Sequence, residues 1–92
     1  MDAEEKRHCF ELLDEYAKTK HNCFVSEFFP SRDDGTYLVC FRALGRSPSD
    51  PNRYACEYVE FDPVALTAIC SSTSLTVATT ERLDKALSRL TH

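Results

Sequence analysis

The fold of this chain is decided by residues 22–62, which read NCFVSEFFPSRDDGTYLVCFRALGRSPSDPNRYACEYVEFD. In this stretch the Asp34-Gly35 pair separates two runs, 23–29 and 36–44, that are rich in aromatic and β-branched residues. An Asp-Gly pair readily adopts the positive φ angles that hairpin turns require. The pattern therefore predicts a β-hairpin whose two strands are these two runs.

Apolar side chains are expected on both faces of this hairpin, because successive residues of a strand point to opposite faces. In the second strand one face carries Tyr37, Val39 and Phe41, and the other carries Leu38, Cys40 and Leu44. In the first strand, strict alternation sets Phe24 and Phe28 against Cys23, Val25 and Phe29. An apolar sheet face needs a cover. We therefore expect helices on one face and a further partner on the other.

A loop and a third strand follow the hairpin. Two prolines and several turn-forming residues mark 45–53 as a surface loop. Residues 54–61 then alternate as a strand should. We expect Val59 and Phe61 on one face of this strand, and Cys56 and Tyr58 on the other.

Residues 64–70 fit two different structures. The Asp62-Pro63 pair can open a helix as its cap and first residue. The stretch 67–80, however, is rich in β-branched residues and poor in strong helix formers, which favours a strand. We predict a fourth strand at this position.

Each end of the chain predicts an amphipathic helix. Asp2 and Glu5 have the spacing of a capping box, and apolar residues then recur at helical intervals up to about Lys20. Asn22 is suited to the left-handed conformation that ends many helices.

In the last helix we expect Thr79 or Thr80 as the cap and Glu81 in the first turn, where the helix dipole favours an anion. Its apolar stripe consists of Leu83, Ala86, Leu87 and Leu90. Residues 1–92 are thus predicted to form a single small α+β domain. It has a mainly antiparallel sheet of three to five strands, with an N-terminal and a C-terminal helix packed on one face.

Composition limits the partners and the chemistry. The net charge is −4 and the charges are interspersed, which argues against nucleic acid or an anionic membrane as the main partner. The five cysteines are odd in number and never form a Cys-x-x-Cys pair, and no apolar span begins the chain. We therefore expect reduced thiols that act as small hydrophobic side chains, and a cytoplasmic or nuclear location.

Few residues point to catalysis or to a cofactor. The chain has no glycine-rich phosphate loop, and Glu57 and Glu60 fall on opposite faces of the third strand. We expect no enzymatic activity, no cofactor and no metal. The alternative is a small metal-binding protein or enzyme that uses Cys23 and His21, whose side chains point the same way if both lie on a strand.

Surplus aromatic residues on the sheet indicate a binding role. Phe28 and Tyr58, with Arg42 beside them, are residue types enriched where protein interfaces concentrate their energy. We therefore expect a protein-binding surface on the sheet. Its partner would be another protein or a second copy of the chain, and the chain would be a subunit or docking domain of a larger assembly.

Residues 35–44, GTYLVCFRAL, resemble the second strand of kinase-associated-1 type domains, which end some AMP-activated and related protein kinases. Residues 74–90, which end in an amphipathic helix, are similar to the end of the same domains. The resemblance implies binding of anionic phospholipid, restraint of a kinase, or docking of regulatory subunits. The acidic charge of this chain departs from the lipid-binding pattern, whereas the subunit-docking role is compatible with it.

Overall fold

The computed structural model describes residues 2–30 and 35–91. Its elements, in chain order, are α1 (Ala3–His21), β1 (Cys23–Pro30), β2 (Tyr37–Ala43), β3 (Cys56–Phe61), α2 (Pro63–Cys70) and α3 (Val77–Leu87). The strands form one antiparallel sheet in the order β1-β2-β3, so β2 is central. The chain is therefore an α+β domain as expected. Three strands, the lower limit of the expected range, lie within the described residues.

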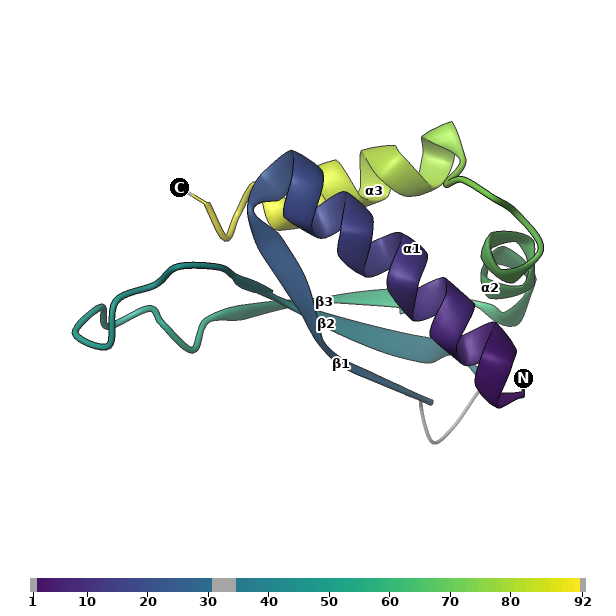
Figure 1. Cartoon of the computed structure of the whole chain (residues 1–92), viewed down its shortest axis with the longest axis horizontal. Helices are drawn as coiled ribbons and strands as arrows, with labels where there is room; N and C mark the ends of the chain where they lie inside the picture. Colours follow the sequence, from purple (N-terminus) through teal and green to yellow (C-terminus); the bar gives the residue numbers. More distant parts are fainter. Residues whose placement is uncertain (1, 31–34, 92) are drawn as a thin grey trace.

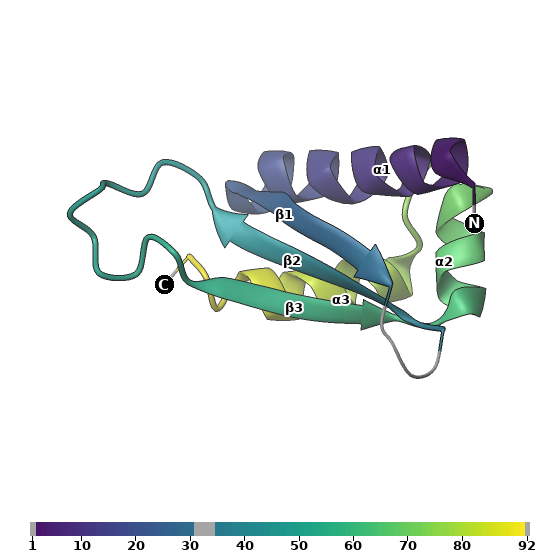
Figure 2. The same cartoon turned by 90° about the horizontal axis from the view of Figure 1, so that it is seen from below.

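The helices are not distributed evenly around the sheet. Helix α1 packs mainly on β1, α3 packs on β3, and these two helices also contact each other on the same side of the sheet (Figure 1). Helix α2 lies across the end of the sheet, beside the first turns of α1 (Figures 1 and 2). The opposite side of the sheet carries no helix of the described residues, as the view from below shows (Figure 2). We call this uncovered side the open face.

A β-bulge in β1 changes which side chains lie on each face. Val25 pairs with Phe41, but Glu27 pairs with Cys40 and Phe28 with Val39, so the register shifts between Val25 and Glu27. A bulge adds one residue to a strand and reverses the alternation beyond it. The expected strict alternation in this strand is therefore wrong.

The bulge moves Phe28 to the helix side of the sheet, where it packs against the core and lies 5.4 Å from the ring of Tyr37. Phe24 and Phe29 share the open face instead. Asp14 of α1 accepts a hydrogen bond from the backbone N–H of Val25 at 2.9 Å, which ties the helix to the strand next to the bulge.

The hairpin itself is confirmed by the pairing of Pro30 with Tyr37. Gly35 has a φ of 74°, a left-handed conformation that favours glycine. Asp34, the other half of the predicted turn, lies outside the described residues.

Local sequence signals define both ends of α1. Asp2 is the N-cap, and its carboxylate accepts a hydrogen bond from Glu5 N at 2.9 Å. Asn22 closes the helix in the left-handed conformation, with a φ of 54°. Both predicted caps are confirmed, because each depends only on residues that are neighbours in the chain.

The predicted fourth strand is wrong, because the segment forms α2. Asp62 caps the helix by accepting a hydrogen bond from Ala65 N at 2.8 Å, and Pro63 occupies the first turn. Leu66 and Ile69, three residues apart, are both buried. A strand would send these two side chains to opposite faces, whereas a helix places both against the core and so overrides the weak β propensity of the segment.

The start of α3 also differs from the prediction. Thr76 caps the helix and accepts a hydrogen bond from Thr79 N at 3.2 Å, so neither Thr79 nor Thr80 is the cap. Glu81 consequently lies beyond the first turn. The predicted apolar stripe is confirmed, since its four members are all buried: Leu83, Ala86, Leu87 and Leu90.

The third strand begins at Cys56, later than expected, because the two residues before it belong to the loop. Its faces are as predicted. Val59 and Phe61 are buried under the helices, and Tyr58 is exposed on the other face.

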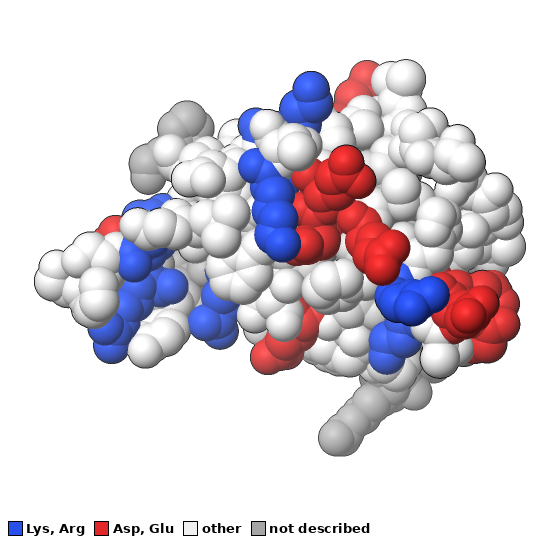
Figure 3. All heavy atoms as spheres, in the orientation of Figure 1, with Lys and Arg blue, Asp and Glu red and all other residues white. Residues whose placement is uncertain are grey.

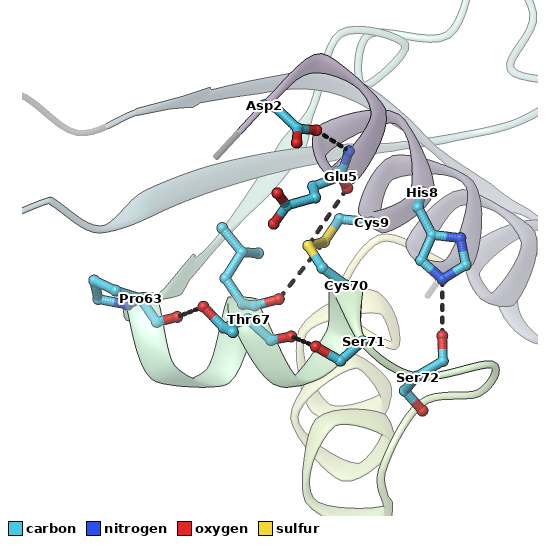
Figure 4. The surroundings of a disulfide bond; sticks show 10 residues. Asp2, Glu5, His8, Cys9, Pro63, Thr67, Cys70, Ser71 and Ser72 are labelled. Carbon is cyan, nitrogen blue, oxygen red and sulfur yellow. Dashed lines mark hydrogen bonds between the residues drawn. A yellow bond between two sulfur atoms is a disulfide. The ribbon is translucent and has the colours of Figure 1, made fainter.

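A disulfide joins Cys9 of α1 to Cys70 at the end of α2, with 5.2 Å between the two Cα atoms (Figure 4). This departs from the expectation that every cysteine is reduced. The other three are free thiols: Cys23, Cys40 and Cys56. Beside the disulfide, His8 Nε2 lies 2.8 Å from the carbonyl oxygen of Ser72, which makes a second link between α1 and the end of α2 (Figure 4).

Truncation of core side chains should lower stability strongly. Leu13, Phe41 and Leu87 are completely buried. Replacing any one with alanine should lower the free energy of unfolding by about 2–5 kcal/mol, because apolar contacts are lost and a cavity is left. Urea unfolding followed by circular dichroism measures this.

The matched control is Val77→Ala, since Val77 is 73% exposed and its truncation should change stability by no more than about 0.5 kcal/mol. Wild-type stability in the three core variants would contradict the packing described above.

Reduction of the disulfide should also destabilise the fold. The bridge spans 61 residues, and closing a loop of that size removes unfolded-state entropy worth about 4 kcal/mol. Urea unfolding with and without dithiothreitol should therefore show a lower midpoint for the reduced protein. The unfolding midpoint of a Cys70→Ala variant should be the same with and without dithiothreitol. If the wild-type midpoint were also the same in both conditions, the expectation would be refuted.

Candidate protein-binding surface

The open face is a half-apolar surface built from all three strands. The register places on it Phe24, Glu27, Phe29, Leu38, Cys40, Arg42, Cys56, Tyr58 and Glu60. Because no described helix covers this side, the partly exposed aromatic and aliphatic groups remain in contact with solvent. Tyr58 is the most exposed of its large apolar side chains, at 55%.

Two neutral polar side chains, Cys40 and Tyr58, lie at the centre of the open face, next to the carboxylate of Glu27. Cys40 lies directly opposite Tyr58, and Cys56 opposite Arg42, on neighbouring strands. Burial is the largest cause that raises the pKa of Cys40 to about 11, and the nearby Cys56 thiol adds to it. A hydrogen bond with Cys56 is the largest cause that raises the pKa of Tyr58 to about 12, and the proximity of the Cys40 and Cys56 thiols adds to it. The Cys40 thiol and the Tyr58 hydroxyl therefore stay protonated, which keeps this part of the surface compatible with an apolar partner.

One end of the open face is basic and aromatic. Where β2 leads into the loop, a cavity of about 280 Å³ is lined by Phe24, Arg42, Arg46, Arg53 and Tyr54, together with four small or apolar residues, Ala43, Leu44, Gly45 and Pro48. Two guanidinium groups lie over the Tyr54 ring, that of Arg53 at 4.6 Å and that of Arg42 at 5.7 Å from the ring centre. The space-filling view shows Lys and Arg side chains gathered at this end of the molecule (Figure 3).

The three arginines of this cavity differ in their partners. Arg46 forms an ion pair with Asp50 at 3.0 Å and donates to the carbonyl of Leu90. Arg53 donates to the carbonyl of Pro48. Arg42, in contrast, has a buried Nε atom with no hydrogen-bond partner, and no described carboxylate pairs with it. A buried donor without a partner is rare in folded proteins, because it has lost water without compensation.

The middle and far end of the open face carry the opposite charge. Glu27 lies opposite Cys40, and Glu60 lies opposite Leu38, near the end of the sheet away from the loop. Both carboxylate residues are exposed. The open face thus has an arginine at one end, apolar side chains along its length, and glutamates in the middle of the β1 edge and at the other end.

The predicted binding residues are divided between the two sides of the sheet. Tyr58 and Arg42 lie on the open face, as expected. Phe28 lies on the helix side, with the Lys6 ammonium 5.8 Å from its ring centre. Arg53, expected in the surface loop, and Tyr54, expected at the start of the third strand, were not among the predicted binding residues.

His21 and Cys23 do not converge on a shared point in space. The Cys23 thiol is buried among the core, burial raises its pKa, and it donates to the backbone carbonyl of His21 at 3.3 Å. The His21 ring instead contacts Asp84 on α3, with 2.6 Å between Nε2 and Oδ1. Within 2–30 and 35–91, no group of three or more histidine, cysteine, aspartate or glutamate side chains is placed to hold a metal ion.

Asp84 links α1 to α3. Its Oδ1 atom accepts a hydrogen bond from the Tyr16 hydroxyl at 2.6 Å, besides the contact with His21. The hydrogen bonds from Tyr16 and His21 lower the pKa of Asp84 below its ordinary value. Burial is the largest cause that raises the pKa of Tyr16 to about 12, and the hydrogen bond to Asp84 adds to it. The contact is structural and does not form part of the open face.

Comparison with known proteins gives no relative. No protein-family model, no curated protein and no solved structure matches the chain significantly.

Among the described residues, no helix combines the length and the apolar character needed to cross a membrane.

The Asp84 contact predicts a pH-dependent contribution to stability. A carboxylate whose pKa is lowered by folding stabilises the native state above its unfolded pKa of about 3.9, and this contribution is lost as the pH falls through the lower folded value. Asp84→Asn should therefore be less stable than wild type at neutral pH. The Asp84 side chain is half exposed, so we expect a difference of about 1 kcal/mol or less.

Urea unfolding at neutral and at strongly acidic pH measures this difference, which should vanish in acid. Glu81→Gln, which removes a carboxylate from the exposed surface of the same helix, is the control and should show no such pH dependence. A deficit of Asp84→Asn that persists unchanged in acid would contradict the assignment.

Proposed function

We propose that the chain is a non-catalytic protein-interaction module that binds another protein through the open face of its sheet. The observation that carries this proposal is an uncovered sheet face bearing Tyr58, Phe24, Phe29 and Leu38 beside an unpaired arginine. Clusters of aromatic residues and arginine are typical of the central part of protein interfaces. The chain would serve as a subunit or docking domain of a larger assembly.

The helices are less suited to this role. Helices α1 and α3 each use an apolar stripe against the sheet and expose charges of both signs, as Figure 3 shows for the side of the molecule that carries α1. The exposed side chains of Arg7 and Glu11 are separated by 4.0 Å, and exposed Lys18 lies 2.7 Å from the partly buried Asp14. Interspersed and mutually paired charges are typical of a solvated helix surface.

A second copy of the chain is the alternative occupant of the surface. Strands β1 and β3 are the two edges of the three-stranded sheet, and exposed edges can pair with another chain. Self-association would therefore use either the open face or one of these edges.

The proposal includes a cytoplasmic or nuclear location. In such a reducing compartment Cys9 and Cys70 would be thiols, each near a backbone carbonyl: Cys9 Sγ is 3.6 Å from Leu66 O, and Cys70 Sγ is 3.4 Å from Glu5 O. Both thiols would have an acceptor there, so the fold does not depend on the disulfide to satisfy these groups.

Substitution on the open face should separate binding from folding. Tyr58→Ser removes a half-exposed ring, so it should abolish or strongly weaken partner binding while circular dichroism stays unchanged. Affinity capture from the native source, compared between wild type and variant by quantitative mass spectrometry, identifies the proteins lost. Sedimentation of the purified chain measures self-association in parallel.

The matched control is Lys85→Glu on the exposed side of α3. It should retain every partner that wild type captures. If Lys85→Glu lost the partners and Tyr58→Ser kept them, the binding surface would lie on the helices and the proposal would be wrong.

A further inference from the structure

We propose that the arginine end of the open face binds a carboxylate of the partner, so that the partner segment is an acidic peptide in which Asp or Glu flanks apolar residues. The inference rests on the proposed function and specifies the chemistry of the partner. Its anchor is Arg42, whose guanidinium lies at the Tyr54 ring in the cavity next to Phe24.

The first support is the unmet hydrogen-bonding capacity of Arg42. Its Nε donor is buried without a partner, whereas the two other arginines of the cavity are already engaged by Asp50, Pro48 and Leu90. A guanidinium presents parallel donors that match the two oxygens of one carboxylate. A partner carboxylate would bind the terminal nitrogens of Arg42, because the Nε atom is shielded from solvent, and would give this guanidinium a charged partner.

The second support is the ordering of charge on the surface. Arg42 lies at the loop end, Tyr58 and Leu38 lie along the face, and Glu60 lies towards the far end. A segment that has an acidic residue beside apolar residues can therefore place its carboxylate on Arg42 and its apolar side chains on Tyr58 and Leu38. Complementary charge at the rim of an interface sets the orientation of the partner and raises its association rate.

The same ordering disfavours an extended polyanion. Phosphate-bearing ligands are usually held by clusters of free arginines, and of the three arginines in this cavity Arg46 is paired with Asp50 and Arg53 already donates to the carbonyl of Pro48. A nucleic acid or an anionic membrane laid along the open face would also meet the exposed carboxylates of Glu27 and Glu60. A single carboxylate with apolar neighbours is the ligand that this surface fits best.

A random peptide library selected on the purified chain tests the inference without knowledge of the natural partner. Four proteins are compared: wild type, Arg42→Gln, Tyr58→Ser and Arg7→Gln. The last is the matched control, because it removes the same charge from the exposed surface of α1. Circular dichroism verifies that all four proteins fold.

Wild type and Arg7→Gln should select peptides in which Asp or Glu adjoins aromatic or aliphatic residues. Arg42→Gln should select apolar peptides without the acidic preference, and Tyr58→Ser should select few or none. One selected peptide, and its counterpart with Asn or Gln in place of the acid, are then titrated into wild type. Loss of the carboxylate should weaken binding roughly 10- to 100-fold, as expected for hydrogen bonds to a charged group.

The same titration followed by NMR reports on the anchor directly. The Nε–H resonance of Arg42 should shift with the acidic peptide and not with its amide counterpart, while that of Arg7 should not move.

The outcomes separate this inference from the proposed function. Apolar peptides selected without an acidic preference, or an acidic preference that survives Arg42→Gln, would overturn the inference and leave the protein-binding role intact. Failure of wild type to select any peptide would count against both. Arg42-dependent sedimentation with phosphatidylserine vesicles, in the absence of peptide binding, would instead assign the cavity to lipid headgroups and overturn the inference.

Discussion

Burial of the helix side of the sheet under α1 and α3 is the interaction on which the rest of the structure depends. Val39 and Phe41 of the central strand are completely buried there, together with Leu13 of α1 and Leu87 of α3. Apolar area removed from water on this side supplies most of the stability available to a domain of this size. In this chain of 92 residues the two longer helices both pack on this one side of the sheet. No further helix or strand among the described residues covers the opposite side. The open face is the structural consequence.

The β-bulge between Val25 and Glu27 determines the character of that open face. One extra residue sends Phe28 to the helix side and Phe29 to the open face, where Phe24 already lies, and both of these side chains on the open face are partly exposed. Phe24 then borders the arginine cavity, so an aromatic side chain stands beside the charged group that lacks a partner. The contact of Asp14 with Val25 N holds the strand at this point, which couples the position of α1 to the composition of the surface on the opposite side.

Charge is ordered along the open face although the net charge of the chain is small. Arginines gather at the loop between β2 and β3, while exposed glutamates lie on the open face away from it. Such an arrangement favours one orientation of a bound segment over the reverse orientation. The neutral Cys40 and Tyr58 between the two charged ends provide the apolar surface that a bound segment would cover.

The sequence by itself determined the features that depend on residues close together in the chain. These are the caps of α1 at Asp2 and Asn22, the hairpin, the alternation of the third strand and the apolar stripe of α3, because each follows from backbone geometry and a local repeat. The tertiary structure decided the rest. The bulge, the helix at Pro63–Cys70, the Cys9–Cys70 bridge and the stacking of Arg42 and Arg53 on Tyr54 all depend on packing between distant segments. A one-residue change of register costs little locally but exchanges the two faces of a strand, so only the packed core could select it.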